Sequence, residues 1–341
     1  MKKIFISLGL SALFLLPAVN SWAQQKPHYT QYILNQYILN PAITGIENYS
    51  DIKLSHRQQW VGIEDAPITS YFTFHTAIGK KDYRTTATSF DVEGENPRGS
   101  SYWENYVAAE PHHGIGVQVI NDRTGPITNF SAYATYAYHM GLSGRTSLSA
   151  GFGVGLNRTS LDASKLDITP VDPAVYNSGI LNRMKPDLMA GIYLYSSDFF
   201  LGVSAQQIIP QKIDFSNGVV TTDDSKKVPH LFATAGYRFL AGENFNVTPS
   251  VMVKYLTNLP TQFDVNTKLQ YRDLAWIGAG YRWKDGFNAM VGLNFSNKVN
   301  LGYSYDYTTS GLQTYSRGTH EFVLGFILGN SYGDSCPRNV W

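Results

Sequence analysis

The feature that most constrains this chain is a strict alternation of apolar and polar residues in segments of about ten residues. One segment places Phe263, Val265, Thr267, Leu269 and Tyr271 between Gln262, Asp264, Asn266, Lys268 and Gln270. Side chains of a β-strand point alternately to its two faces, so each such segment has one apolar and one polar face. Aromatic residues stand near the ends of several segments. This pattern is typical of strands that contact lipid on one face and line a polar lumen on the other.

Fourteen segments carry the pattern, at 51–60, 70–79, 113–122, 129–140, 147–158, 186–196, 199–208, 230–239, 245–255, 262–271, 274–283, 286–295, 299–306 and 320–328. An even number is usual for bacterial barrels with both chain ends in the periplasm. A sheet with open edges would leave backbone groups unpaired in hydrocarbon, so the sheet must close. The sequence therefore predicts an all-β fold, a transmembrane antiparallel β-barrel over residues 50–328 with a tail at 329–341.

The lengths of the connections agree with this topology. With a periplasmic N-terminus, five of the six connections expected on the periplasmic side are short, and the long ones, 159–185, 209–229 and 307–319, fall on the other side. The exception is the charged stretch 80–112, which contains Gly and Pro. We expect it to project from the barrel; the alternative is a missing pair of strands.

The first residues predict a cleavable signal peptide over 1–23. Lys2 and Lys3 precede an apolar run, and Ser21 and Ala23 are the small residues expected before a cleavage site at Gln24. The apolar run is short for a spanning helix, which needs about 20 residues. A soluble β-sandwich shares the alternation, but it does not explain the signal peptide, the aromatic segment ends and the alternating loop lengths together. We therefore expect export to the outer membrane.

Composition excludes several function classes. Without the two lysines of the signal peptide, 25 basic residues face 26 acidic ones, a balance that does not suit nucleic-acid binding. The single cysteine, Cys336, cannot form an internal disulfide. The pair His112-His113 lacks further residues at metal-ligand spacing, and the sequence holds no nucleophile motif. We expect no enzyme activity, no cofactor and no bound metal.

Residues 24–49 do not alternate and include the pentad Gln-Tyr-Ile-Leu-Asn twice, at 31–35 and 36–40. Asn40-Pro41 and Gly45 predict a turn before the first strand. The stretch is rich in Tyr and Ile for a disordered leader, so we expect a plug inside the lumen; a disordered leader is the alternative.

The first strand raises a further question about which face its polar residues occupy. Arg57 and Gln59 should face the lumen if Ile52 and Leu54 face lipid. Arg57 would then form either an ion pair that holds the plug or a solvated lumenal charge. His56 and Gln58 fall on the lipid face, where polar groups are unfavourable, so we expect a β-bulge or a protein cover there.

These elements bring the chain close to a known family. The plug stretch reads Gln31-Tyr32, Asn35, then Asn40-Pro41-Ala42 and Gly45, and is followed by Arg57-Gln58-Gln59-Trp60. Further matches in order are Gly116-Val117, Ile120-Asn121-Asp122-Arg123-Thr124-Gly125-Pro126, Tyr133-Ala134-Thr135-Tyr136-Ala137-Tyr138, Tyr305-Asp306-Tyr307, Gly318-Thr319-His320-Glu321 and Cys336-Pro337. The ordered set resembles the PorP/SprF family of type IX secretion membrane proteins.

The resemblance implies a non-enzymatic barrel in a Gram-negative outer membrane. Members would serve export or cell-surface anchoring of large secreted proteins, including gliding adhesins, through a C-terminal targeting domain, with other secretion components as periplasmic partners. The long loops carry apolar residues that we expect to contact such a partner: Leu161, Leu166, Ile168, Val175, Val219 and Val220. The alternative function is a passive porin or solute channel.

Overall fold

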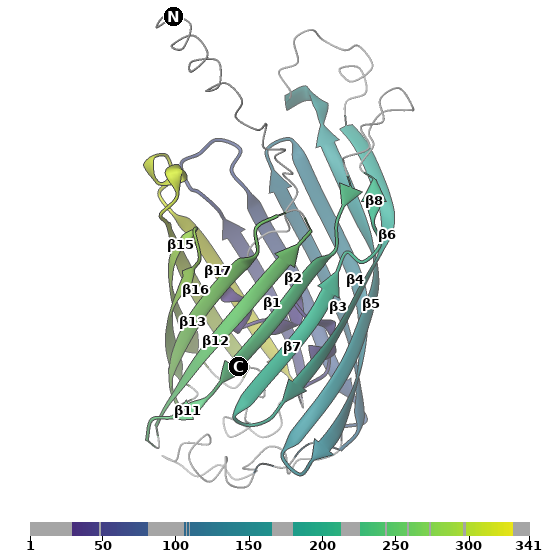
Figure 1. Cartoon of the computed structure of the whole chain (residues 1–341), viewed down its shortest axis with the longest axis vertical. Coiled ribbons are helices and arrows are strands. Elements are labelled where there is room, and N and C mark those ends of the chain that lie inside the picture. Colours follow the sequence, from purple (N-terminus) through teal and green to yellow (C-terminus); the bar gives the residue numbers. More distant parts are fainter. Residues whose placement is uncertain are drawn as a thin grey trace, which may run out of the picture.

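The computed structural model describes residues 29–47, 49–80, 106, 108, 110–165, 180–212, 226–242, 244–257, 259–272, 274–295 and 298–329 (Figure 1). Fourteen antiparallel strands form a barrel that closes where the first strand pairs with the last. They are β1 (Ser50–Gln58), β2 (Ile68–Ile78), β3 (His112–Thr124), β4 (Ile127–Ser143), β5 (Thr146–Asp162), β6 (Ile180–Tyr195), β7 (Phe199–Gln206), β10 (His230–Tyr237), β12 (Phe245–Leu256), β13 (Gln262–Tyr271), β14 (Ala275–Arg282), β15 (Gly286–Asn294), β16 (Val299–Thr308) and β17 (Thr319–Leu328). The short β11 (Phe239–Leu240) extends the pairing along β12, and β8 (Gln211–Lys212) pairs with β9 (Lys226–Lys227) apart from the barrel.

The prediction of a fourteen-stranded barrel is confirmed, and each predicted segment overlaps one of these strands. The largest differences are at β4, β5 and β6, which have 17, 17 and 16 residues and extend beyond the predicted segments. We call the end of the barrel at which β1 begins the lower end and the opposite end the upper end, as drawn in Figure 1.

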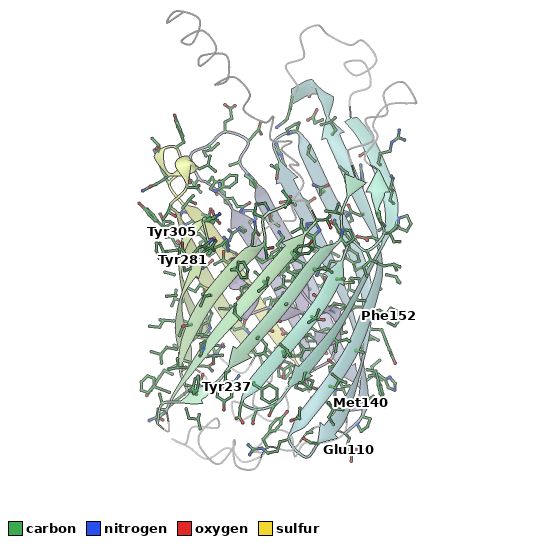
Figure 2. All side chains as sticks on the ribbon, in the orientation of Figure 1. Glu110, Met140, Phe152, Tyr237, Tyr281 and Tyr305 are labelled. Atoms are coloured by element: carbon green, nitrogen blue, oxygen red, sulfur yellow. The ribbon has the colours of Figure 1, made fainter. Side chains whose placement is uncertain are left out.

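The two faces of the wall have the predicted chemistry. Apolar side chains such as Phe152, Val265 and Ile277 lie on the outside, each about half exposed. Polar side chains at alternate positions, such as Gln118, Asn266 and Ser304, are buried inside. Figure 2 shows Phe152 and Met140 on the outer surface. Each strand therefore contacts lipid with its outer face and makes polar contacts inside the barrel with its inner face.

Aromatic pairs mark both ends of the outer face. Phe245 and Tyr271 pack with ring centroids 5.0 Å apart at the lower end, and Tyr281 and Phe287 pack at 4.9 Å at the upper end. Rings with an apolar body and a polar tip favour the interface between hydrocarbon and water. No helix among the described residues is long and apolar enough to cross a membrane.

The prediction of a β-bulge in β1 is wrong. The register runs without interruption from Asp51 opposite His75 to Gln58 opposite Ile68. His56 and Gln58 are exposed on the outer face near the end of β1, and His56 Nδ1 lies 2.9 Å from Ser70 Oγ. These residues are among the last of the strand. They therefore lie away from the middle of the bilayer although they point outward, and no bulge is needed to turn them inward.

The connection 80–112 adds no pair of strands to the barrel wall between β2 and β3, because these strands pair directly along eleven residue pairs, from Ile68–Arg123 to Ile78–His113. At least one residue of the connection packs inside the molecule and does not project from the barrel. Tyr106 is buried in a cluster with Ile43 and Ile46. Its remaining residues, apart from Lys80, Ala108, Glu110, Pro111 and His112, lie outside the described part of the chain.

Of the expected partner-contacting residues, Leu161 lies within β5 and pairs with Leu181 of β6 and Ile127 of β4, so it is not a loop residue. The others, Leu166, Ile168, Val175, Val219 and Val220, lie outside the described residues, as do the signal peptide and Cys336.

Candidate functional site: the lumenal segment and its wall

Residues 29–47 lie inside the barrel, and we call them the lumenal segment. They form three short 3-10 helices, η2 (Thr30–Ile33), η3 (Gln36–Ile38) and η4 (Pro41–Ile43). Almost every side chain of the segment is buried. Hydrogen bonds join the segment to β1, β2, β3, β4, β5, β6, β7, β13, β14, β16 and β17. It therefore contacts the wall on opposite sides of the barrel.

The local sequence explains the last turn of the segment. Asn40 precedes η4 and its Oδ1 accepts a hydrogen bond from the Ala42 N–H at 2.9 Å, while Pro41 takes the first helical position. An Asn cap followed by Pro is a favoured helix start. Gly45 then adopts a φ of +75°, a conformation that other residues adopt only with strain. This turn leads the chain to β1 at the lower end.

At its upper end the segment joins a buried network of ions. Arg57 of β1 pairs with Asp306 of β16 at 2.7 Å and with Glu321 of β17 at 2.9 Å. Thr30 lies among them: its N–H donates to Glu321 Oε2 at 2.9 Å, and its hydroxyl donates to Asp306 Oδ2 at 2.6 Å. Gln31 Nε2 donates to the Glu321 carbonyl oxygen at 2.7 Å. Removing one partner of such a network leaves a buried charge uncompensated, at a cost of about 3–5 kcal/mol.

A second arginine extends the network around the wall. Arg282 of β14 lies 3.1 Å from Asp264, 3.0 Å from Asp285 and 3.7 Å from Asp306. Asp306 therefore links the two arginines. Four carboxylates surround the two guanidinium groups, so each guanidinium has at least two carboxylate partners.

The two pentads make matching contacts with opposite walls. In the first, Tyr32 OH accepts a hydrogen bond from Asn266 Nδ2 of β13 at 2.8 Å. In the second, Tyr37 OH lies 2.6 Å from Thr135 Oγ1 of β4. Burial raises the pKa of Tyr32 and of Tyr37 above the ordinary value of a phenol, so both hydroxyls stay neutral. The five-residue step thus directs one tyrosine to each side of the lumen.

The final asparagines of the pentads also bind the wall. Asn35 Nδ2 donates to Thr73 Oγ1 of β2 at 3.0 Å, and Asn40 Nδ2 donates to the Ile192 carbonyl oxygen of β6 at 3.0 Å. Gln206 of β7 donates to the carbonyl oxygens of Ile38 and Leu39 at 2.9 and 2.8 Å. The two bonds from Gln206 satisfy carbonyl oxygens that the short 3-10 helix η3 leaves free.

Three histidines hold the lower end of the segment. The Gly45 N–H donates to His75 Nδ1 at 3.2 Å, His112 Nε2 lies 3.2 Å from the Gly45 carbonyl oxygen, and His139 Nε2 lies 2.8 Å from that of Thr44. The rings of His112 and His139 stack at 4.5 Å. Nearby, Lys80 donates to the Ile46 carbonyl oxygen at 2.6 Å. The histidines act here as hydrogen-bond partners of the backbone. Among the described residues, no group of three or more His, Cys, Asp or Glu side chains is arranged so that it could hold a metal ion.

Glycines of the wall make room for the segment. A Cβ on Gly151 of β5 would lie 2.5 Å from the Pro41 carbonyl oxygen, and one on Gly116 of β3 would lie 2.5 Å from Tyr37 OH. Further glycines of the same kind are Gly114, Gly191 and Gly302, which face Thr44, Asn40 and Gln31. The segment can approach the wall closely at these positions because they have no side chain.

The structure places all the expected family-motif residues, Gln31, Tyr32, Asn35, Asn40, Pro41, Ala42 and Gly45, inside the barrel. Arg57 and Gln59 are buried, and Arg57 carries the ion pairs described above. Sequence reasoning missed the role of Thr30 in the segment and its partners on distant strands, which are Asp306, Glu321, Arg282 and, at the lower end, the three histidines. The alternation indicated that these side chains point inward, but no local signal shows which of them meet.

A closed antiparallel barrel with an apolar outer belt, aromatic rims and a polar interior defines an outer-membrane β-barrel protein. A family model described as type IX secretion system membrane protein PorP/SprF matches residues 21–326. The chain belongs to this family.

Solved structures with a similar fold are distant in sequence. The Ralstonia pickettii toluene transporter TbuX is 8% identical with a TM-score of 0.49, covering 87% of this chain and 92% of its own. The monoaromatic hydrocarbon channel CymD is 9% identical with a TM-score of 0.48, covering 88% and 92%. The Acinetobacter baumannii outer membrane protein Omp33 is 8% identical with a TM-score of 0.44, covering 84% and 100%. Comparison with curated protein sequences gives no match.

Proposed function

We propose that this protein is a non-enzymatic component of type IX secretion that receives a large secreted protein at the cell surface. It binds the C-terminal targeting domain of that protein and helps to export it or to anchor it, and in a gliding organism the bound protein is an adhesin. The chain reaches the outer membrane through its cleavable signal peptide, and periplasmic secretion components contact its lower end.

One observation carries this proposal beyond family membership. The lumenal segment is held to opposite walls by ion pairs and hydrogen bonds along its whole length. We propose that the segment is a fixed plug. A lumen occupied in this way favours a binding platform over a passive porin or solute channel, which is the second candidate function.

The upper end is the proposed docking surface. The connection 309–318 carries an exposed knob there, η7 (Gly311–Thr314) followed by Tyr315, whose side chain is 73% exposed. Backbone hydrogen bonds between Val61 and the residues Arg317 and Gly318 join this connection to 59–67. Exposed aromatic and aliphatic residues on an ordered loop favour contact with another protein.

The test places a photoreactive amino acid at Tyr315 in living cells. We expect ultraviolet light to crosslink this position to a protein that carries a type IX targeting domain at its C-terminus, identified by mass spectrometry. The matched control is Leu142, 57% exposed at the lower end, which should give no such product. Crosslinks to lipid alone at both positions, together with solute conductance of the wild-type barrel in planar bilayers, would favour the porin function instead.

A further inference from the structure

The pairing between β1 and β17 differs from the other pairings of the barrel. It joins residues 50–58 to residues 320–328, whereas the other neighbouring strands are close together in the chain. The entropic cost of closing a loop grows with its length, so this seam is the most costly to form. The whole intervening chain must be in place before the seam closes.

The alternation of residues does not define the register of the seam. A slip by one residue would exchange the lipid and lumenal faces, but a slip by two residues keeps every side chain on its own face. The outer side of the seam tolerates such a slip, because Ile52 and Leu54 lie opposite Phe326 and Leu324 and all four are apolar. Contacts on the inner side must therefore select the native register.

The inner side of the seam is where the lumenal segment is bound most specifically. Arg57 and Glu321 are direct partners in the register of β1 and β17, and Thr30 and Gln31 both bind Glu321. After a two-residue slip Arg57 would lie opposite Val323 or Thr319 instead. Its charge would then lose Glu321 in a buried environment, which is strongly unfavourable.

The lower end of the seam has a second contact with the N-terminal part of the chain. Tyr49 packs against Ile327 of β17 in a buried cluster. The chain from Thr30 to Tyr49 thus contacts the last strand at both ends, while Thr30 also binds Asp306 of β16. These contacts can form before β1 pairs with β17, because none of their wall atoms takes part in the β1–β17 hydrogen bonds.

We propose that the lumenal segment is a built-in closure template. It docks on the inner face of β16 and β17 through Thr30 and Gln31, brings β1 to the edge of β17 and selects the register in which the barrel closes. This role goes beyond the proposed function, and it holds whether the finished barrel binds a secreted protein or conducts solutes.

The experiment reports the register by disulfide formation, in the mature chain with Cys336→Ser, refolded from urea into detergent micelles. The pair Leu54→Cys and Leu324→Cys are opposite in the native register. The pair Leu54→Cys and Phe322→Cys become opposite only after a two-residue slip, since diagonal partners lie about 7–8 Å apart, beyond normal disulfide reach. With the wild-type segment we expect only the native pair to crosslink.

The double variant Thr30→Val with Gln31→Ala removes the side-chain template contacts to Asp306 and to the Glu321 carbonyl oxygen, and it leaves the Thr30 N–H bond and the wall intact. We expect the slipped pair to crosslink about tenfold more than with the wild-type segment, because several buried hydrogen bonds no longer favour the native register. The matched control is Tyr37→Phe, which weakens the segment away from the seam and should leave the native pair dominant.

If the double variant yields no folded barrel, a synthetic peptide of residues 29–47 added during refolding supplies the second measurement. Recovery of the heat-modifiable band and of the native crosslink supports the proposal, and no recovery contradicts it. A native crosslink at unchanged yield and rate in the double variant also overturns it. None of these readouts depends on a secreted partner, so their failure is distinguishable from failure of the proposed function.

Discussion

Two regions of the lumen wall use glycine in opposite ways. On β3, β5 and β6, inward glycines face the lumenal segment: Gly114 and Gly151 face its backbone, and Gly116 and Gly191 face the side chains of Tyr37 and Asn40. On β14 and β15, inward glycines face large side chains of the wall itself: Gly292 faces Trp276 and Gly278 faces Met290. The first region, which we call the receiving wall, has space for a separate segment. The second, the self-filled wall, closes that space with its own side chains.

The difference predicts how well each region tolerates an added side chain at its glycines. A Cβ on Gly151 or Gly114 of the receiving wall meets backbone atoms of the hydrogen-bonded segment, which cannot move aside as a flexible side chain can. A Cβ on Gly278 would lie 3.1 Å from the terminal methyl of Met290, a flexible side chain that can adopt another rotamer. Adding a side chain to each wall therefore tests whether the two regions differ in rigidity.

The largest effect is expected from removing the occupant of the receiving wall. Deleting residues 26–44 should convert a non-conducting barrel into one with readily measured conductance in planar bilayers, because it removes a segment whose side chains are almost all buried in the lumen. Equal conductance of the two forms would show that the segment does not block the lumen. Semi-native electrophoresis of the deletion protein checks that the barrel still forms.

A bulky residue on the receiving wall should come next. Gly151→Val brings a branched side chain against Pro41 and Ala42, and overpacking of this kind costs about 1–3 kcal/mol or more. We expect a lower urea midpoint in lipid vesicles, and partial conductance where the segment is displaced. An unchanged midpoint and a closed lumen would mean that the segment is not packed against β5.

Removing single hydroxyls from the two pentads should have a smaller effect. Tyr37→Phe and Tyr32→Phe each delete one buried hydrogen bond to opposite walls, worth about 1 kcal/mol. Urea denaturation in vesicles measures both, and we expect similar losses. A large loss in one and none in the other would show that only one wall holds the segment.

The smallest effect is expected on the self-filled wall. Gly278→Ala should change the free energy of unfolding by less than about 1 kcal/mol and leave conductance at the wild-type level, because Met290 can give way. A loss as large as that of Gly151→Val would remove the distinction between the two walls.

The wall could be predicted from the sequence because its pattern is local. A period of two is visible within any ten residues, and lipid demands it on every strand, so the segments near Phe152 and Val265 were found without knowledge of their neighbours. The bulge expected at His56 was wrong because the pattern alone does not say where along a strand the bilayer ends.

The interior was harder to predict for a physical reason. Thr30 and Glu321 are separated by 291 positions, and their contact depends on how fourteen strands close around the segment. The alternation shows that Glu321 points inward, but it does not show what Glu321 meets. The inward glycines have the same ambiguity, because Gly151 and Gly278 look alike in the sequence and differ only in what approaches them.

The two tyrosines of the pentads have a mechanical consequence. Tyr32 is bonded to β13 and Tyr37 to β4, on different sides of the barrel, and five residues of one continuous chain connect them. In a barrel without such an internal connection, only the hydrogen-bonded wall itself resists flattening under the lateral pressure of the bilayer. Here, moving β4 and β13 apart stretches a short, hydrogen-bonded piece of chain, and moving them together compresses it. We therefore expect the cross-section of this barrel to resist deformation along that diameter.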